Sequence, residues 1–231
     1  MKREPVVDYR EFRLSRLNEP RFEHLKLLGF WLVYFALYFI TENLIPVEKC
    51  YVVHSWIDDL IPFNEVFVLA YAGWYFLVIW SLWYFGMYNI DHFKKLSKYI
   101  IITQIIAMTI YVLFPNMQDL RPAVYPRDNF LTDVVAFIQA FDTNTNVCPS
   151  LHVGYSLGIA STWLREKSAS VSTKIFVVTA VIIICLSTMF IKQHSVIDFF
   201  AAIPMCVFAD LVVFRDEWKQ TFKKLTKKAL D

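Results

Sequence analysis

Three side chains of this sequence have the types and the spacing needed for acid–base or nucleophilic chemistry. Asp198 follows His194 by four residues, so on a helix the two side chains share a face, one turn apart. A carboxylate that hydrogen-bonds one imidazole nitrogen fixes the tautomer and leaves the other nitrogen basic and nucleophilic. His152 begins another apolar segment and could protonate a leaving group while His194 attacks. Taken alone, the His194–Asp198 pair could also be purely structural.

The residues beside these histidines suit an anionic substrate. Arg121 offers a planar fork of donors that can clamp phosphate oxygens. Ser150 offers a hydroxyl, and the backbone N–H groups of residues 150–152 open a predicted helix, where the helix dipole attracts anions. The four cysteines are scattered and show no metal-type pairing, and we expect no cofactor.

The surrounding sequence is that of a membrane protein. Its hydrophobic content is 57%, whereas soluble domains usually have about 45–50%. A spanning helix needs roughly 17–25 mostly apolar residues. The sequence therefore predicts an all-α polytopic protein with six transmembrane helices, over residues 27–44, 66–88, 99–114, 151–164, 175–191 and 196–214. A charged side chain within such a helix costs about 2.5–3.5 kcal/mol on insertion scales, which makes Asp198 a functional candidate.

The distribution of basic residues predicts the orientation of these helices. Nineteen of the 23 lysines and arginines fall in the terminal segments and in the loops after the second and fourth helices. The positive-inside rule then puts both termini in the cytoplasm. His152 and His194 would face the other, non-cytoplasmic side of the cell membrane.

The chain divides into a basic N-terminal segment (1–26), a membrane catalytic domain (27–214) and a basic C-terminal tail (215–231). In the tail, the apolar residues from Trp218 onward fall on one helical face, which predicts an interfacial helix. A second amphipathic stripe runs from Phe130 to Phe141 and is too short to span. It predicts a helix on the membrane surface or, alternatively, a lid over a substrate.

These motifs resemble those of the type-2 phosphatidic acid phosphatase superfamily of integral membrane lipid phosphatases and phosphotransferases. The family's first motif, Lys, six residues, Arg-Pro, is similar to the segment ending in Arg121-Pro122. Its Pro-Ser-Gly-His motif is similar to residues 149–152. Its third motif, Ser-Arg, five residues, His, three residues, Asp, keeps all its spacings over residues 187–198.

The resemblance implies a role for each matching residue. His194 would be the nucleophile that forms a phosphohistidine, oriented by Asp198, and His152 would be the acid and base. Arg121 and Ser150 would hold the phosphoryl group, and no metal is implied. The substrate would be a lipid phosphate in the bilayer, with membrane lipids and not nucleic acid as partners; the oligomeric state is left open.

Three positions depart from the family pattern. Phe114 stands where the family has lysine, Thr188 where it has arginine, and Leu151 where it has glycine. The Pro-Ser-Leu-His form is similar to the branch that contains inositol-phosphorylceramide synthases, which transfer a lipid headgroup. Because a positioned donor is typically worth about 10²–10³ in rate, something should replace the two cations. Lys192 follows Thr188 by four residues, so a continuous helix would place it on the same face, where it could supply the missing positive charge. The alternative is that Lys192 only extends its charged end to the membrane surface.

The expected function is hydrolysis of a lipid phosphate or diphosphate at the outer leaflet through a phosphohistidine. Transfer of a headgroup to a lipid acceptor is the close alternative, since water or a lipid hydroxyl could resolve the same intermediate. A second alternative is an inactive, lipid-binding relative, which the two missing cations would support. The site residues of these hypotheses are His152, His194 and Asp198 with Arg121, Ser150, Thr188 and Lys192.

Overall fold

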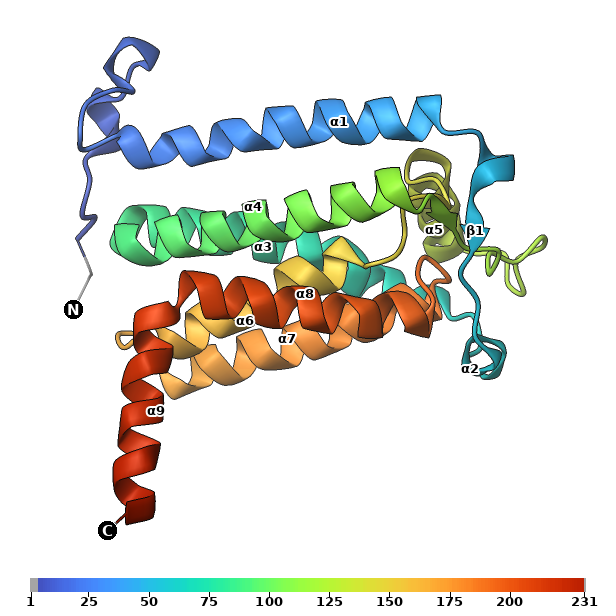
Figure 1. The fold of residues 1–231 in the computed structure, drawn as a ribbon. Helices are drawn as coiled ribbons and strands as arrows, with labels where there is room; N and C mark the ends of the chain where they lie inside the picture. The colour runs from blue at the N-terminus through green and yellow to red at the C-terminus, as the bar shows by residue number, and fades with distance from the viewer. Residues whose placement is uncertain (1–3, 231) are drawn as a thin grey trace.

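The computed structural model describes residues 4–230 and is mostly helical (Figure 1). Five helical segments are long and apolar enough to cross a membrane, and they begin at residues 23, 65, 90, 171 and 196. The α-helices are α1 (Phe30–Leu44), α2 (Trp56–Leu60), α3 (Val68–Tyr88), α4 (Ile90–Leu113), α5 (Phe130–Phe141), α6 (Leu151–Arg165), α7 (Val171–Phe190), α8 (Val196–Val213) and α9 (Arg215–Leu230). Two short strands, β1 (Tyr51–Val52) and β2 (Asn116–Met117), pair in parallel. The 3-10 helices are η1 (Tyr9–Glu11), η2 (Leu14–Arg16), η3 (Glu23–Gly29), η4 (Val47–Lys49) and η5 (Glu65–Phe67).

The long helices lie side by side, and the two ends of the bundle differ in character. The N-terminal segment and α9 lie at one end, which we call the basic end (Figure 1). The elements α2, α5 and β1 lie at the opposite end, together with the loop that carries His194 (Figure 1). We call this second end the motif end.

The expected third helix begins earlier than its apolar residues suggest. It was predicted to start at Tyr99, but α4 starts at Ile90, directly after α3. The Asn89 side chain accepts a hydrogen bond from the backbone N–H of His92 and caps the new helix. Lys94, Lys95 and Lys98 therefore lie on the first turns of α4 and not in a loop, because a good cap lets a helix begin with a polar turn.

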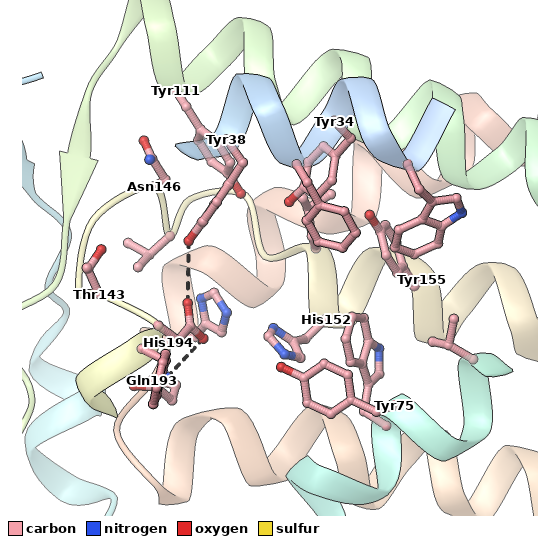
Figure 2. Close-up of a pocket in the computed structure, with 18 of the residues that line it drawn as sticks. Tyr34, Tyr38, Tyr75, Tyr111, Thr143, Asn146, His152, Tyr155, Gln193 and His194 are labelled. Atoms are coloured by element: carbon pink, nitrogen blue, oxygen red, sulfur yellow. Dashed lines mark hydrogen bonds between the residues drawn. The ribbon is translucent and has the colours of Figure 1, made fainter. Parts of the chain in front are cut away.

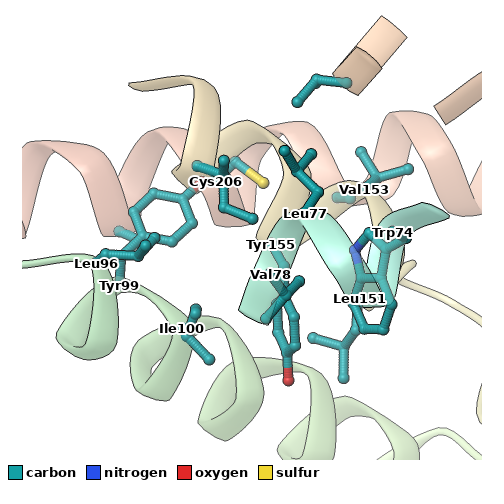
Figure 3. Close-up of a cluster of buried hydrophobic side chains, with 14 of the residues drawn as sticks. Trp74, Leu77, Val78, Leu96, Tyr99, Ile100, Leu151, Val153, Tyr155 and Cys206 are labelled. Atoms are coloured by element: carbon teal, nitrogen blue, oxygen red, sulfur yellow. The ribbon is translucent and has the colours of Figure 1, made fainter. Parts of the chain in front are cut away.

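The central helix, α6, packs against α3, α4, α7 and α8. Small residues allow this close packing: a Cβ added at Gly158 would lie 2.4 Å from ring atoms of Tyr99, and one at Gly154 would lie 3.2 Å from Met205. Large apolar side chains of α3, α4 and α6 fill the surrounding core, which Figure 3 shows around Tyr155 and Trp74.

α6 has only 15 residues and is therefore about 22 Å long, less than the roughly 30 Å of a hydrocarbon core. The loop that leads into it carries several buried residues, among them Val147 and Ser150. Irregular backbone that is buried must find its hydrogen bonds within the protein. Asn116 supplies them: its side chain accepts from the N–H groups of Val147 and Cys148 and donates to the Cys148 carbonyl.

The two amphipathic segments form helices as expected. α9 turns away from α8 at the buried Phe214, and the Trp218 indole donates to Asp210 at 2.6 Å. α5 packs on α3 and η5 through the buried Val135, while Phe130 and Phe137 are exposed. Of the aromatic stripe, Phe141 alone lines the cavity described below.

Candidate active site

The structure brings together the three side chains with the clearest chemistry. Nδ1 of His194 lies 3.0 Å from Oδ2 of Asp198, and the ring centroids of His194 and His152 lie 5.6 Å apart. Because a carboxylate can only accept a hydrogen bond from this ring, the neutral imidazole of His194 carries its proton on Nδ1 and keeps a lone pair on Nε2.

Asp198 also builds the start of the helix on which it lies. Its Oδ2 accepts from the N–H of Ser195 at 2.9 Å, and the Ser195 hydroxyl caps the first turn, which completes a capping box. The same oxygen therefore fixes both the first turn of α8 and the ring of His194. Oδ1 of Asp198 has no hydrogen-bond partner among the described residues.

Cys148, for which the sequence analysis predicted no role, is a neighbour of Asp198. Burial and the Asp198 carboxylate raise the pKa of the Cys148 thiol to about 12, so the thiol stays protonated. A thiol beside a carboxylate is a weak donor, and this one faces the carboxylate that orients His194. Only the closeness of Cys148 to the Pro149–His152 motif could have indicated this placement.

His152 lies on the first turn of α6 and packs against aromatic rings of α3. Its ring centroid lies 4.5 Å from that of Tyr71 and 4.4 Å from that of Trp74, both on α3. Its Nε2 is buried and has no hydrogen-bond partner among the described residues. This nitrogen is thus available to exchange a proton with a bound molecule.

The turn before His152 is fixed to both neighbouring helices. The Tyr111 hydroxyl of α4 donates to the carbonyl of Pro149 at 2.7 Å, and the N–H of Ser150 donates to the carbonyl of Asp198 at 3.1 Å. Ser150 is fully buried, and its hydroxyl caps α6 by accepting from the N–H of Val153. Ser150 therefore positions the two histidine-bearing helix starts against each other, and its hydroxyl is engaged within the protein.

The three other residues expected to bind phosphate do not line the cavity at the histidines. Arg121 donates to the carbonyls of Gln139 and Asp142 and so caps the C-terminal end of α5; burial lowers the pKa of its guanidinium. The Thr188 hydroxyl is fully buried and bonds the Cys185 carbonyl within α7.

Lys192 departs from expectation because α7 ends before it. The helix stops at Phe190, and Lys192 has a positive φ of 59°. Its ammonium group turns away to the carbonyls of Asp58 and Ile61, at 2.7 and 2.5 Å. The expectation that a continuous helix would carry Lys192 on the face of Thr188 is therefore wrong.

The histidines lie at one end of an elongated cavity of about 590 Å³ (Figure 2). Aromatic and apolar side chains of α1, α3 and α6 form most of its wall, from Leu28 and Trp31 to Tyr38 beside the motif end. Residues 28–38, at the end of η3 and in α1, correspond to roughly 15 Å of helix. Apolar cavities of this size suit small-molecule ligands and here extend along the bundle axis.

Apart from tyrosine hydroxyls and tryptophan nitrogens, the polar side chains of the described lining gather at the histidine end of the cavity. They include Asp142, Gln193 and Asn146, none of which the sequence analysis singled out. Figure 2 shows Gln193 beside His194, with Tyr38, Thr143 and Asn146 nearby. Gln193 directly precedes His194, and that adjacency was the one available signal.

Comparison with known proteins adds no further constraint. No family model, curated protein or solved structure matches this chain. Among the described residues, no group of three or more histidine, cysteine, aspartate or glutamate side chains could hold a metal ion.

Proposed function

We propose that the protein is a membrane enzyme that cleaves a lipid phosphate ester through a phosphohistidine on His194. The observation that carries this proposal is the 3.0 Å hydrogen bond between His194 and a fully buried Asp198, with His152 facing the same cavity. Asp198 holds the proton on Nδ1, so Nε2 can attack phosphorus. His152 can give a proton to the leaving oxygen and take one from the acceptor.

The cavity supports a lipid as the substrate. Its wall is largely aromatic and aliphatic and runs along helices apolar enough to cross a membrane. An acyl or prenyl chain buried there would leave the phosphate beside the two histidines. The segregation of basic residues supports placing this site on the non-cytoplasmic side of the cell membrane, with six spans and both termini in the cytoplasm.

Hydrolysis of a lipid phosphate or diphosphate is the first form of this activity, with water as the acceptor. Transfer of a headgroup to a lipid hydroxyl is the second candidate. It is favoured by the absence of lysine and arginine from the described cavity lining, because a phosphomonoester dianion normally requires such cations.

Purified protein in detergent tests the proposal against phosphatidic acid, a polyprenyl diphosphate, and a phospholipid supplied with ceramide or diacylglycerol. Release of inorganic phosphate identifies a phosphatase, and formation of a new phospholipid without phosphate release identifies a transferase. With phosphorus-labelled substrate, we expect an acid-labile, base-stable phosphoprotein that is absent from His194→Ala. Turnover that survives His194→Ala would exclude the mechanism, and no turnover of any lipid would favour an inactive lipid-binding protein.

A further inference from the structure

Asp142 is the one carboxylate on the wall of the cavity within the described chain. It follows the last residue of α5 and lies at the histidine end. Its Oδ2 accepts from the Tyr71 hydroxyl at 2.8 Å and from Nε2 of Gln193 at 3.0 Å, and its Oδ1 accepts from the Tyr38 hydroxyl at 3.4 Å. Gln193 is the neighbour of His194, so the carboxylate is fixed close to the reacting group.

No cation in the described chain forms an ion pair with this carboxylate. Arg121 is the nearest candidate, and its guanidinium donates to the backbone carbonyl of Asp142 instead. Lys192 faces the carbonyls of α2 and its following turn. The polar end of the cavity therefore combines an acidic group with neutral hydrogen-bonding groups.

This charge pattern discriminates between classes of phosphate. A phosphomonoester carries about −1.5 to −2 charges at neutral pH and would lie against Asp142 with no arginine or lysine on the described lining of the cavity. Like charges at short range in a protein interior are strongly unfavourable. A phosphodiester carries a single negative charge, so its repulsion from Asp142 is about half as large.

The same end of the cavity offers unused hydrogen-bonding capacity. Nδ2 of Asn146 and Oε1 of Gln193 have no partner among the described residues, although these residues are only 8% and 2% exposed. A carboxylate has about four acceptor positions, and Asp142 uses three. Buried polar groups are normally satisfied, so a ligand that supplies donors and acceptors fits this end of the cavity.

We propose that Asp142 is a specificity-determining residue that selects a lipid phosphodiester with a hydrogen-bond-donating headgroup. The shared chemistry is a hydroxyl or primary ammonium donor facing the carboxylate; a quaternary ammonium headgroup has no such donor. The inference rests on the phosphohistidine chemistry proposed above. It adds that the headgroup stays on phosphorus during the reaction, bound at Asp142.

The reaction balances as two displacements at phosphorus. Nε2 of His194 attacks, the bond from phosphorus to the diacylglycerol oxygen breaks, and protonated His152 gives that oxygen its proton. A hydroxyl of water or of a lipid alcohol then attacks phosphorus and loses its proton to His152. The phosphorus–nitrogen bond breaks and restores His194, and the headgroup phosphate leaves on its new oxygen.

The test compares lipids with identical acyl chains in mixed micelles and measures diacylglycerol release by the full-length protein. The probes are phosphatidylinositol and phosphatidylglycerol (polyol headgroups), phosphatidylethanolamine (primary ammonium), phosphatidylcholine (quaternary ammonium) and phosphatidic acid (monoester). We expect kcat/KM for the donor headgroups to exceed that for phosphatidylcholine and phosphatidic acid by about 10- to 100-fold, the effect of a hydrogen bond to a charged group. Turnover of the polyol lipids would identify a hydroxyl as the headgroup donor, and turnover of phosphatidylethanolamine would identify a primary ammonium group.

Asp142→Asn should reduce turnover of the donor headgroups by about tenfold and narrow the gap to phosphatidic acid. Asp119→Asn is the matched control, because Asp119 lies at the same end with a side chain that is 52% exposed, and it should leave the ranking unchanged. If the protein turns over phosphatidic acid faster than the diesters, and His194→Ala abolishes that turnover, the result would overturn this inference but not the proposed function. No turnover of any lipid would overturn the proposed function as well. The order of kcat/KM values measured for these lipids with the wild-type protein tests the inference without any variant, so the test remains valid even if Asp142→Asn fails to fold.

Discussion

The Ser195 hydroxyl donates a hydrogen bond to Oδ2 of Asp58 at 2.6 Å, across 137 positions of the sequence. Asp58 is almost fully buried and also accepts from the N–H of Val196 and from that of Ser55. The carboxylate therefore joins the capping box of α2 to the first turn of α8. His194 directly precedes that turn, so α2 braces the loop that presents the nucleophile.

Asp58→Ala should destabilise the protein and displace His194. The change leaves buried donors without an acceptor, at about 1–3 kcal/mol for each group. A nucleophile misplaced by about 1 Å loses roughly 100-fold in rate. We expect a lower unfolding temperature in detergent and a matching fall in kcat. Asp59→Ala is the control, since Asp59 is 64% exposed and bonds only His54 among the described contacts. Equal effects of the two changes would show that the brace is unimportant.

Asp198→Asn separates the orienting role of Asp198 from its role in the helix cap. An amide keeps one acceptor for the N–H of Ser195, and asparagine is a tolerated residue in a helix first turn. It cannot hold the Nδ1 proton of His194 with the same charge, and the corresponding change in a catalytic triad costs about 10⁴ in kcat. We expect a loss of roughly 10³–10⁴ in phosphohistidine formation, with little change in unfolding temperature. If Asp198→Asn instead loses much of its stability, and phosphorylation falls only as far as the amount of folded protein falls, then Asp198 is a structural residue.

Lys192→Ala should act on stability and on all substrates alike. The ammonium group satisfies two carbonyls beside α2, and burial lowers its pKa despite the nearby Asp58 and Asp59. Removing it should lower the unfolding temperature and reduce kcat for every lipid by a similar factor. Lys49→Ala, at the same end and outside the cavity, is the control. A selective loss for phosphatidic acid at unchanged stability would instead restore Lys192 as a phosphate ligand.

The sequence was sufficient to predict the limits of α6, α7 and α8 and the pairing of His194 with Asp198, because both follow from local patterns. The observed limits of α6, α7 and α8 lie within four residues of those expected. The four-residue spacing of His194 and Asp198 places the two on one helical turn in almost any context. Asp198 could be paired with His194 for the same reason.

The cations and Asp142 could not be predicted in the same way, because their roles depend on distant segments. Lys192 turns toward Asp58, 134 residues earlier, once α7 stops at Phe190. Arg121 is taken up by the end of α5, whose exposed carbonyls need donors. Asp142 faces Tyr71 and Gln193 only because α5 packs on α3 at the motif end. Spacing along the chain carries no signal for any of these contacts.

Gly158 should tolerate no larger side chain. A Cβ there would lie 2.4 Å from the ring of Tyr99, so Gly158→Ala forces α6 and α4 apart. Overpacking of this kind costs about 1–3 kcal/mol. We expect a clearly lower unfolding temperature in detergent. Gly73→Ala is the matched control because nothing lies within 4 Å of its added Cβ, and replacing a helical glycine by alanine should leave stability unchanged or slightly raised.

Glu166 makes the stability of the basic end depend on pH. Burial opposes its ionisation, but hydrogen bonds from Ser168 and Asn89 and the nearby His92 lower its pKa from 4.5 to about 2. The folded state therefore binds this proton more weakly than the unfolded state does. Its stabilising contribution is complete above pH 4.5 and is lost as the pH falls from there toward 2. Unfolding temperatures measured between pH 7 and pH 3 should fall less steeply for Glu166→Gln than for the wild type. Parallel curves for the two proteins would contradict this assignment.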